Sequence, residues 1–151
     1  MNTIKLKDYT KINIEENAAA AITPGMLVEL TSAGKVQAHS NAGQDALTMI
    51  ALEDDLQGND IDDAYSTDNP VQVWIPNRGC EAYMILATSQ TIAIGDFLSS
   101  NGNGMLKKHV PDASEIYATT DVTVYGRQII GQAIEAKTTT SAAARIKVRI
   151  I

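Results

Sequence analysis

The chain has 151 residues, of which 44% are hydrophobic, and a formal net charge of −6. A chain of this length is expected to form one domain and to bury about two thirds of its unfolded surface. The acidic balance argues against a general nucleic-acid binder, which would be basic. No apolar run reaches the roughly 18 residues of a membrane span, and the first residues lack the apolar core of a signal peptide. We therefore expect a protein made in a cytoplasm, with no nucleic-acid or membrane partner.

The first segment alternates apolar and polar residues with a period of two. Its aliphatic residues share one parity and its lysines the other: Ile4, Leu6, Ile12 and Ile14 against Lys5, Lys7 and Lys11. This alternation predicts an amphipathic extended strand. Because an alanine-rich spacer follows, we interpret residues 1–20 as an N-terminal arm and residues 21–151 as the main domain. An ordinary first strand of the domain is the alternative.

Two later segments, seventy residues apart, have the same pattern. "ITPGMLVELTSAGKVQAH" (22–39) and "IAIGDFLSSNGNGMLKKH" (92–109) align without a gap. Pro-Gly and Asn-Gly turns between apolar runs predict a β-hairpin in each segment. An Ala-x-Glu motif and an alternating strand follow each hairpin, "NPVQVWIP" in the first half and "ARIKVRII" in the second. The sequence therefore predicts a repeated unit, with chance similarity of two glycine-rich hairpins as the alternative.

Helical periodicity is weak throughout the chain. No segment of 11 or more residues has a convincing 3.6-residue period, and only residues 111–117 suggest a short helical turn. Regularly spaced strands separated by Gly, Pro and Asn are typical of a barrel or sandwich. We expect an all-β fold, a compact β-barrel in which two copies of the hairpin unit close with pseudo-twofold symmetry and few free edges.

Charge is unevenly distributed along the chain. The stretch between Lys35 and Arg78 holds eight carboxylates and no lysine or arginine, whereas the last 26 residues hold five basic residues and one glutamate. Stretches of opposite charge can dock head to tail or face different partners. Solvation of surface loops is the simpler alternative.

Few residues suggest chemistry. His39 and His109 occupy the same place in the repeat, but no carboxylate or thiol lies at ligand spacing beside them, so we expect strand-end surface residues rather than a metal pair. The acidic stretch "EDDLQGNDIDDAYSTD" does not match the order of an EF-hand loop and is interpreted as a solvated loop. Cys80 is expected to be a small buried residue. Trp74 is either a core residue or an interface anchor. No catalytic, cofactor-binding or metal site is expected.

The order of these motifs resembles the head decoration, or capsid cement, proteins of tailed bacteriophages. The resemblance covers about residues 20–151 and depends on "ITPGMLVEL", "ALEDDLQGNDIDDAY", "TIAIGDFL" with "NGNGML", and "GQAIEA" before the final strand. It implies a β-tulip or β-clip fold without enzymatic activity. Such proteins are usually trimeric, sit on the capsid exterior near local threefold axes and stabilise the shell, so the implied location is the virion.

The implied partners are the major capsid protein and further copies of this chain. An amphipathic strand can add to an exposed sheet edge of a coat protein, so we expect the arm to dock and to be disordered in the free protein. The candidate docking residues are Ile4, Lys5, Leu6, Lys7, Ile12 and Ile14. A closed trimer needs heterologous contacts, for which the acidic loop and the basic final strand are suited. The candidate trimer residues are Asp60, Asp62, Asp63, Trp74, Arg145, Lys147 and Arg149.

Two other functions stay open. The strand entry Gly95-Asp96-Phe97-Leu98 is similar to entries of β-clip enzymes and small-ligand binders such as SAF-domain and dUTPase-like proteins. That resemblance implies Asp96 as a site residue, although the other motifs of such enzymes are missing. The third function is an adhesive or receptor-binding protein on the virion surface.

Overall fold

The computed structural model describes residues 2–9, 12–111 and 126–151, and within these ranges the regular structure is almost entirely β. The elements are β1 (Lys5–Lys7), β2 (Asn13–Asn17), β3 (Val28–Leu30), β4 (Val36–Ala38), β5 (Ile50–Ala51), the 3-10 turn η1 (Asp55–Gln57), β6 (Pro70–Trp74), β7 (Glu81–Leu86), β8 (Thr91–Ile92), β9 (Phe97–Ser100), β10 (Leu106–Lys108), β11 (Ile129–Ala133), β12 (Lys137–Thr138) and β13 (Ala144–Ile150). The expected all-β class is confirmed. The helical turn expected at 111–117 lies, beyond Pro111, outside the described residues.

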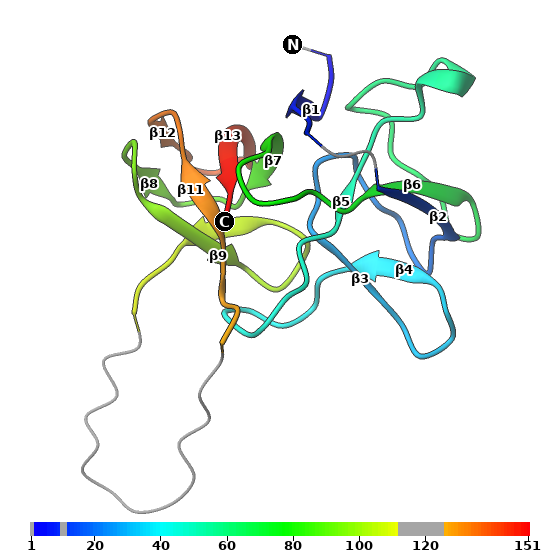
Figure 1. Ribbon diagram of the computed structural model, residues 1–151, viewed down its shortest axis with the longest axis horizontal. Helices are drawn as coiled ribbons and strands as arrows, with labels where there is room; N and C mark the ends of the chain where they lie inside the picture. The colour runs from blue at the N-terminus through cyan, green and yellow to red at the C-terminus, as the bar shows by residue number, and fades with distance from the viewer. Residues whose placement is uncertain (1, 10–11, 112–125) are drawn as a thin grey trace, which may run out of the picture.

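A closed five-stranded barrel forms the larger lobe (Figure 1). Its strand order is β7-β10-β9-β11-β13, and β13 pairs again with β7. The β7–β13 ladder extends from Leu86↔Ala144 to Glu81↔Arg149. Because side chains alternate along a strand, Ile146, Val148 and Ile150 of β13 point into the barrel and are buried.

The smaller lobe repeats this strand order. β2 pairs with β6, β6 with β5, and β3 with β4, while the bridges Leu27↔Ile50 and Ala18↔Val36 complete the ring. In the larger lobe, β7, β9, β10, β11 and β13 take the places of β2, β3, β4, β5 and β6. The five pairings just given then correspond, in the same order, to β7–β13, β13–β11, β9–β10, β11–β9 and β7–β10. The β7–β10 pairing and the Ala18↔Val36 bridge are both parallel. The predicted repeat is therefore present, but the expectation that its two copies close a single barrel is wrong: each copy forms its own lobe, and only the second closes as one continuous sheet.

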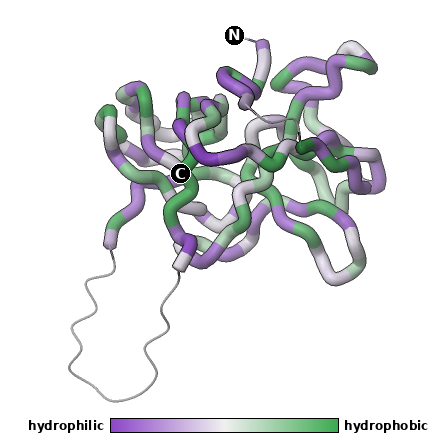
Figure 2. The backbone as a smooth tube through the Cα atoms, in the orientation of Figure 1, coloured by the Kyte–Doolittle hydropathy of each residue, from purple (hydrophilic) through white to green (hydrophobic). Residues whose placement is uncertain are grey.

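The apolar core has two clusters: one lies within the smaller lobe, and the other fills the larger barrel and continues into the smaller lobe at Leu27, Ile50 and Trp74. The smaller core contains Ala18, Ile22, Val28, Val36, Met49, Ala51, Tyr65, Val71 and Val73. The hydroxyl of Tyr65 donates to the carbonyl oxygen of Leu52 at 2.7 Å, and burial raises the pKa of Tyr65 to about 12. The larger core includes Trp74 and Cys80, both fully buried. Figure 2 shows hydrophobic and hydrophilic residues interspersed along the strands of both lobes, which is the pattern of sheets with one buried face.

The burial of Trp74 settles the alternative left open by the sequence. Its side chain has no exposed surface and belongs to the larger core. It therefore offers no surface to a partner, and Trp74 is removed from the candidate trimer residues.

The N-terminal segment pairs with both lobes. β1 pairs with β7, and β2 pairs with β6 over its full length. Ile4 is fully buried, and its backbone N–H donates to both carboxylate oxygens of Glu53 at 3.1 Å. The structure thus differs from the expected disordered arm, because the chain's own sheet edges accept the alternating strand that a partner's sheet was expected to accept. The division at residue 20 stays a prediction.

No helix in the described part of the chain is long and apolar enough to cross a membrane.

Candidate interaction surfaces

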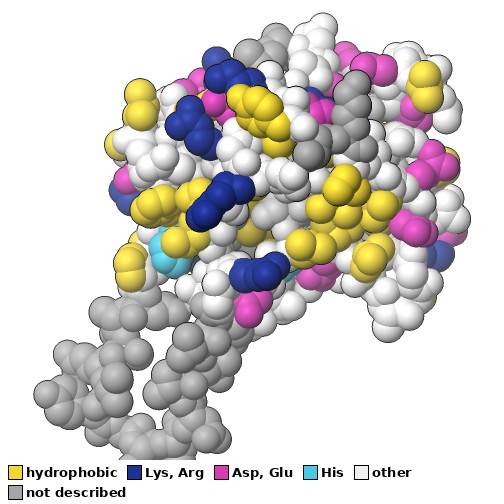
Figure 3. Space-filling model, viewed as in Figure 1, with side chains coloured by type: hydrophobic (Ala, Val, Ile, Leu, Met, Phe, Trp, Pro, Cys, Tyr) yellow, Lys and Arg dark blue, Asp and Glu magenta, His cyan; other side chains and the backbone are white. Residues whose placement is uncertain are grey.

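An open groove of about 580 Å³ lies where the two lobes meet. Its walls are the connection between β4 and β5, the segment after β6, the beginning of β11 and the last two residues of the chain. Leu47 is 56% exposed and Ile151 is 43% exposed, and Ile75 and Ile129 also line the groove. Figure 3 shows apolar side chains gathered in the centre of this face, with Lys and Arg side chains near them. Exposed apolar surface of this kind is typical of an interaction site.

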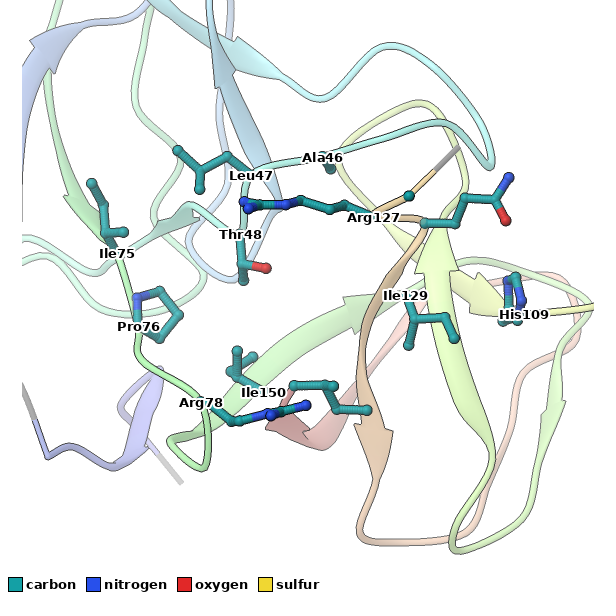
Figure 4. A pocket seen from close by; sticks show the side chains of 13 residues that line it. Ala46, Leu47, Thr48, Ile75, Pro76, Arg78, His109, Arg127, Ile129 and Ile150 are labelled. Carbon is teal, nitrogen blue, oxygen red and sulfur yellow. The ribbon is translucent and has the colours of Figure 1, made fainter. Parts of the chain in front are cut away.

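Two arginines lie on opposite sides of the groove (Figure 4). Arg127 extends over one wall toward Thr48, and Arg78 lies at the other side near Ile150. Within the described ranges, neither guanidinium forms an ion pair with a carboxylate of this chain. The apolar groove therefore has a positively charged rim.

A second exposed feature is the acidic turn around η1, which we define as residues 53–63. Leu56, at the centre of η1, is 96% exposed and follows the exposed Asp55. η1 ends at Gly58, whose φ of 78° lies in the left-handed region that favours glycine. In Figure 2 the tube over the projecting turn is largely hydrophilic. The turn therefore presents one large apolar side chain in an acidic segment whose exposed carboxylates are those of Asp55, Asp60, Asp62 and Asp63.

The basic residues at the end of β13 bind acids of the same chain. Arg149 lies 3.0 Å and Lys7 3.2 Å from the carboxylate of Glu81, and Lys147 lies 3.8 Å from Glu135. Hydrogen bonds from Arg149 and Lys7 outweigh burial and hold the pKa of the Glu81 carboxyl below its usual value. The pairing of β13 with β7 places Arg149 directly opposite Glu81. These charges are therefore already paired within one copy.

Arg145 binds the acidic turn of its own chain. Its guanidinium donates to the carbonyl oxygen of Pro24 at 3.1 Å and to that of Ile61, and it lies 3.4 Å from Asp62. The buried Nε of Arg145 has no hydrogen-bond partner among the described residues. An acidic loop and the basic final strand therefore meet within one chain; the predicted contact between these segments of neighbouring copies is not tested by this contact and stays a prediction.

Asp60 and Asp63 are exposed and organise the same turn. The side chain of Asp63 accepts the N–H of Asp60 at 2.9 Å, and that of Asp60 accepts the N–H of Asp62 at 2.8 Å. These hydrogen bonds lie within one copy and do not test a contact between copies. The trimer role of the acidic residues therefore stays a prediction.

The candidate docking residues divide by burial. Ile4 is a core residue and is removed from the docking candidates, whereas Lys7 and Ile12 are exposed. Lys5, Leu6 and Ile14 are half-buried. The ammonium of Lys5 lies 5.2 Å from the centre of the Trp74 ring. The docking role of the exposed residues stays a prediction.

The two histidines do not share an environment. His39 is buried, with Nδ1 at 2.8 Å from Ser100 Oγ, so the expectation of a surface residue is wrong for this histidine. The second hairpin covers it, since the N–H of Gly104 donates to the carbonyl oxygen of His39. His109 lines the groove instead. No group of three or more His, Cys, Asp or Glu within the described ranges could hold a metal ion.

Asp96 has structural contacts. Its carboxylate accepts the N–H of Ala93 at 2.9 Å and lies 2.7 Å from the ammonium of Lys108. These bonds close the turn before β9 and join it to β10. They account for an aspartate at this strand entry.

These features define the class of protein as an all-β chain with a closed five-stranded barrel, a smaller lobe of the same strand order, and an apolar groove between them. No protein-family model and no curated protein matched the sequence. Among solved structures, the chain is similar to the head fiber gp8.5 N base in bacteriophage phi29, with a TM-score of 0.56 and 9% sequence identity. The similarity covers 94% of this chain and 95% of that chain, so the two share a fold over almost their whole lengths.

Proposed function

We propose that the chain is a structural protein of a bacteriophage head that binds the outside of the assembled shell and stabilises it. The observation that carries this proposal is the full-length fold similarity to a head fiber base. The motif order in the sequence points separately to head decoration proteins. Fold similarity alone does not define function, so the surfaces of this chain have to supply the mechanism.

The proposed partner is the major capsid protein, and the contact is the outer edge of the smaller lobe. β2 pairs with β6 along one edge, while its other edge is joined to β4, among the described residues, only near Ala18 and Ala19. Its N–H and C=O groups can accept a strand of the coat protein, with the exposed Ile12 just before β2. This replaces a free arm as the route of strand addition.

Stabilisation follows from mass action. A protein that binds the assembled shell and not the loose subunit favours assembly. A homotrimer at a local threefold axis would engage three shell sites, and after the first contact the others become intramolecular. Weak individual contacts then suffice.

The test compares heads that carry the protein with heads stripped of it. Stripped heads should release DNA at a lower temperature and on milder osmotic shock, and re-addition of the purified protein should restore resistance. An Ile12→Glu variant should restore less resistance than an Ile94→Glu control, because Ile94 is also exposed but lies far along the sequence from β2. Equal resistance of stripped and complete heads would contradict the proposal.

A further inference from the structure

The acidic turn and the groove have complementary shapes and charges. The turn presents Leu56, an apolar side chain that is almost completely exposed, beside the carboxylate of Asp55. The groove presents an open apolar floor between Arg78 and Arg127. The groove gathers several apolar side chains into one exposed surface, and Leu56 adds a leucine that is almost completely exposed, so both features leave apolar surface in water.

The two features cannot satisfy each other within one copy. Arg145 holds the acidic turn against the end of the larger barrel, through Ile61 and Asp62. None of the residues that line the groove belongs to the turn. In Figure 1, η1 projects at one end of the molecule, on the far side of β6, whereas Figure 4 places the groove between the lobes.

We propose that the groove receives Leu56 of the acidic turn from a second copy of this chain. In this contact the leucine packs against Leu47, Ile75 and Ile129, and the carboxylates of the turn face Arg78 and Arg127. Charge complementarity selects this occupant: the groove's arginines are without ion pairs in the described chain, and the turn holds the densest group of carboxylates in the sequence. A large side chain entering an apolar pocket with charged residues at its rim is the usual form of an energetic hot spot.

Such a contact is heterologous, because each copy contributes a different surface. Heterologous contacts form a closed ring when the rotation between copies closes, and a filament when it does not. This inference rests on the self-association proposed above, but it does not depend on binding to the capsid. It replaces the basic end of β13, whose charges are paired internally, with the groove as the partner of the acidic turn.

The test is a complementation experiment by sedimentation velocity on the full chain. Leu56→Asp removes the apolar side chain from the turn, and Leu47→Glu puts a carboxylate into the groove; both residues are exposed, so neither change disturbs the core. Each variant alone should be monomeric, with self-association at least about tenfold weaker than that of the unmodified chain. A mixture of the two should form a 1:1 heterodimer, because one intact turn and one intact groove remain. An Ile94→Glu control, at an equally exposed residue outside the groove, should associate normally.

The outcomes separate this inference from the proposed function. Self-association that persists in Leu56→Asp, or a variant mixture that stays monomeric, overturns the inference but leaves trimer formation standing. A chain that is monomeric at every concentration overturns both the groove contact and a preformed trimer, while binding to heads is measured independently. If a higher salt concentration weakens the self-association of the chain, that result supports a contact between the carboxylates of the turn and the arginines at the rim of the groove.

Discussion

The burial of Ile4 leads to a sharp prediction about the N-terminal segment. Ile4 has no exposed surface, and its side chain packs close to Gly25 at the entry to the first hairpin. Truncation of a fully buried isoleucine to alanine costs about 2–5 kcal/mol, because the apolar contacts are lost and a cavity remains. For a chain of this size, each kcal/mol lowers Tm by about 2–4 °C, so Ile4→Ala should lower Tm by roughly 4–20 °C.

The matched control is Ile12→Ala, which changes the same residue type in the same segment. Ile12 is 52% exposed, so its truncation should change the unfolding free energy by no more than about 0.5 kcal/mol. The assay is urea unfolding followed by Trp74 fluorescence, since this single tryptophan is buried in the same core as Ile4. Equal, small effects of the two substitutions would refute the packing of the segment and restore the free arm.

Three further predictions concern stability. Glu81→Gln should destabilise the chain at pH 7. The difference in unfolding free energy between the variant and the unmodified chain should shrink as pH falls below the ordinary carboxyl pKa near 4.5, because a lowered folded-state pKa stabilises the fold only while the carboxyl is ionised. Equal effects at pH 7 and pH 3 in urea titrations would contradict the pairing. Arg145→Ala should cost about 2–3 kcal/mol by leaving buried carbonyls unbound. Arg149→Ala should cost only about 1 kcal/mol, because the Arg149 side chain is half exposed and Lys7 still pairs with the buried Glu81. The reverse order in thermal unfolding would count against this assignment. Gly131→Ala should cost about 1–3 kcal/mol or more, since a Cβ there would lie 2.4 Å from Val148 Cγ1, and unchanged stability by calorimetry would show that the site relaxes.

The hairpins could be predicted because their information is local. Gly25 and Gly95 have φ values of 90° and 93°, so the aligned glycines mark turns whose backbone conformation favours that residue. The alternating strands likewise follow from side-chain parity. The prediction that each half of the chain repeats the same unit used this local evidence together with the matching order of the later strands.

The partners of charged and apolar surfaces could not be predicted, because they depend on register and on tertiary position. The position of Glu81 opposite Arg149 follows from the β7–β13 register, which no local pattern specifies. Leu47 and Ile129 lie far apart in the sequence, and only the packing of the lobes brings them to one groove. One local signal was available: Leu56 directly follows three consecutive acidic residues and precedes Gln57 and Gly58, a polar context in which an apolar side chain is expected to be exposed.

A cryo-EM reconstruction of phage heads that carry this chain tests the central claim most directly. The account predicts density for the two-lobed fold on the outer surface of the shell, with the smaller lobe against the coat protein and neighbouring copies joined through the groove. Heads without such density, prepared under conditions in which the chain is intact and in excess, would contradict it.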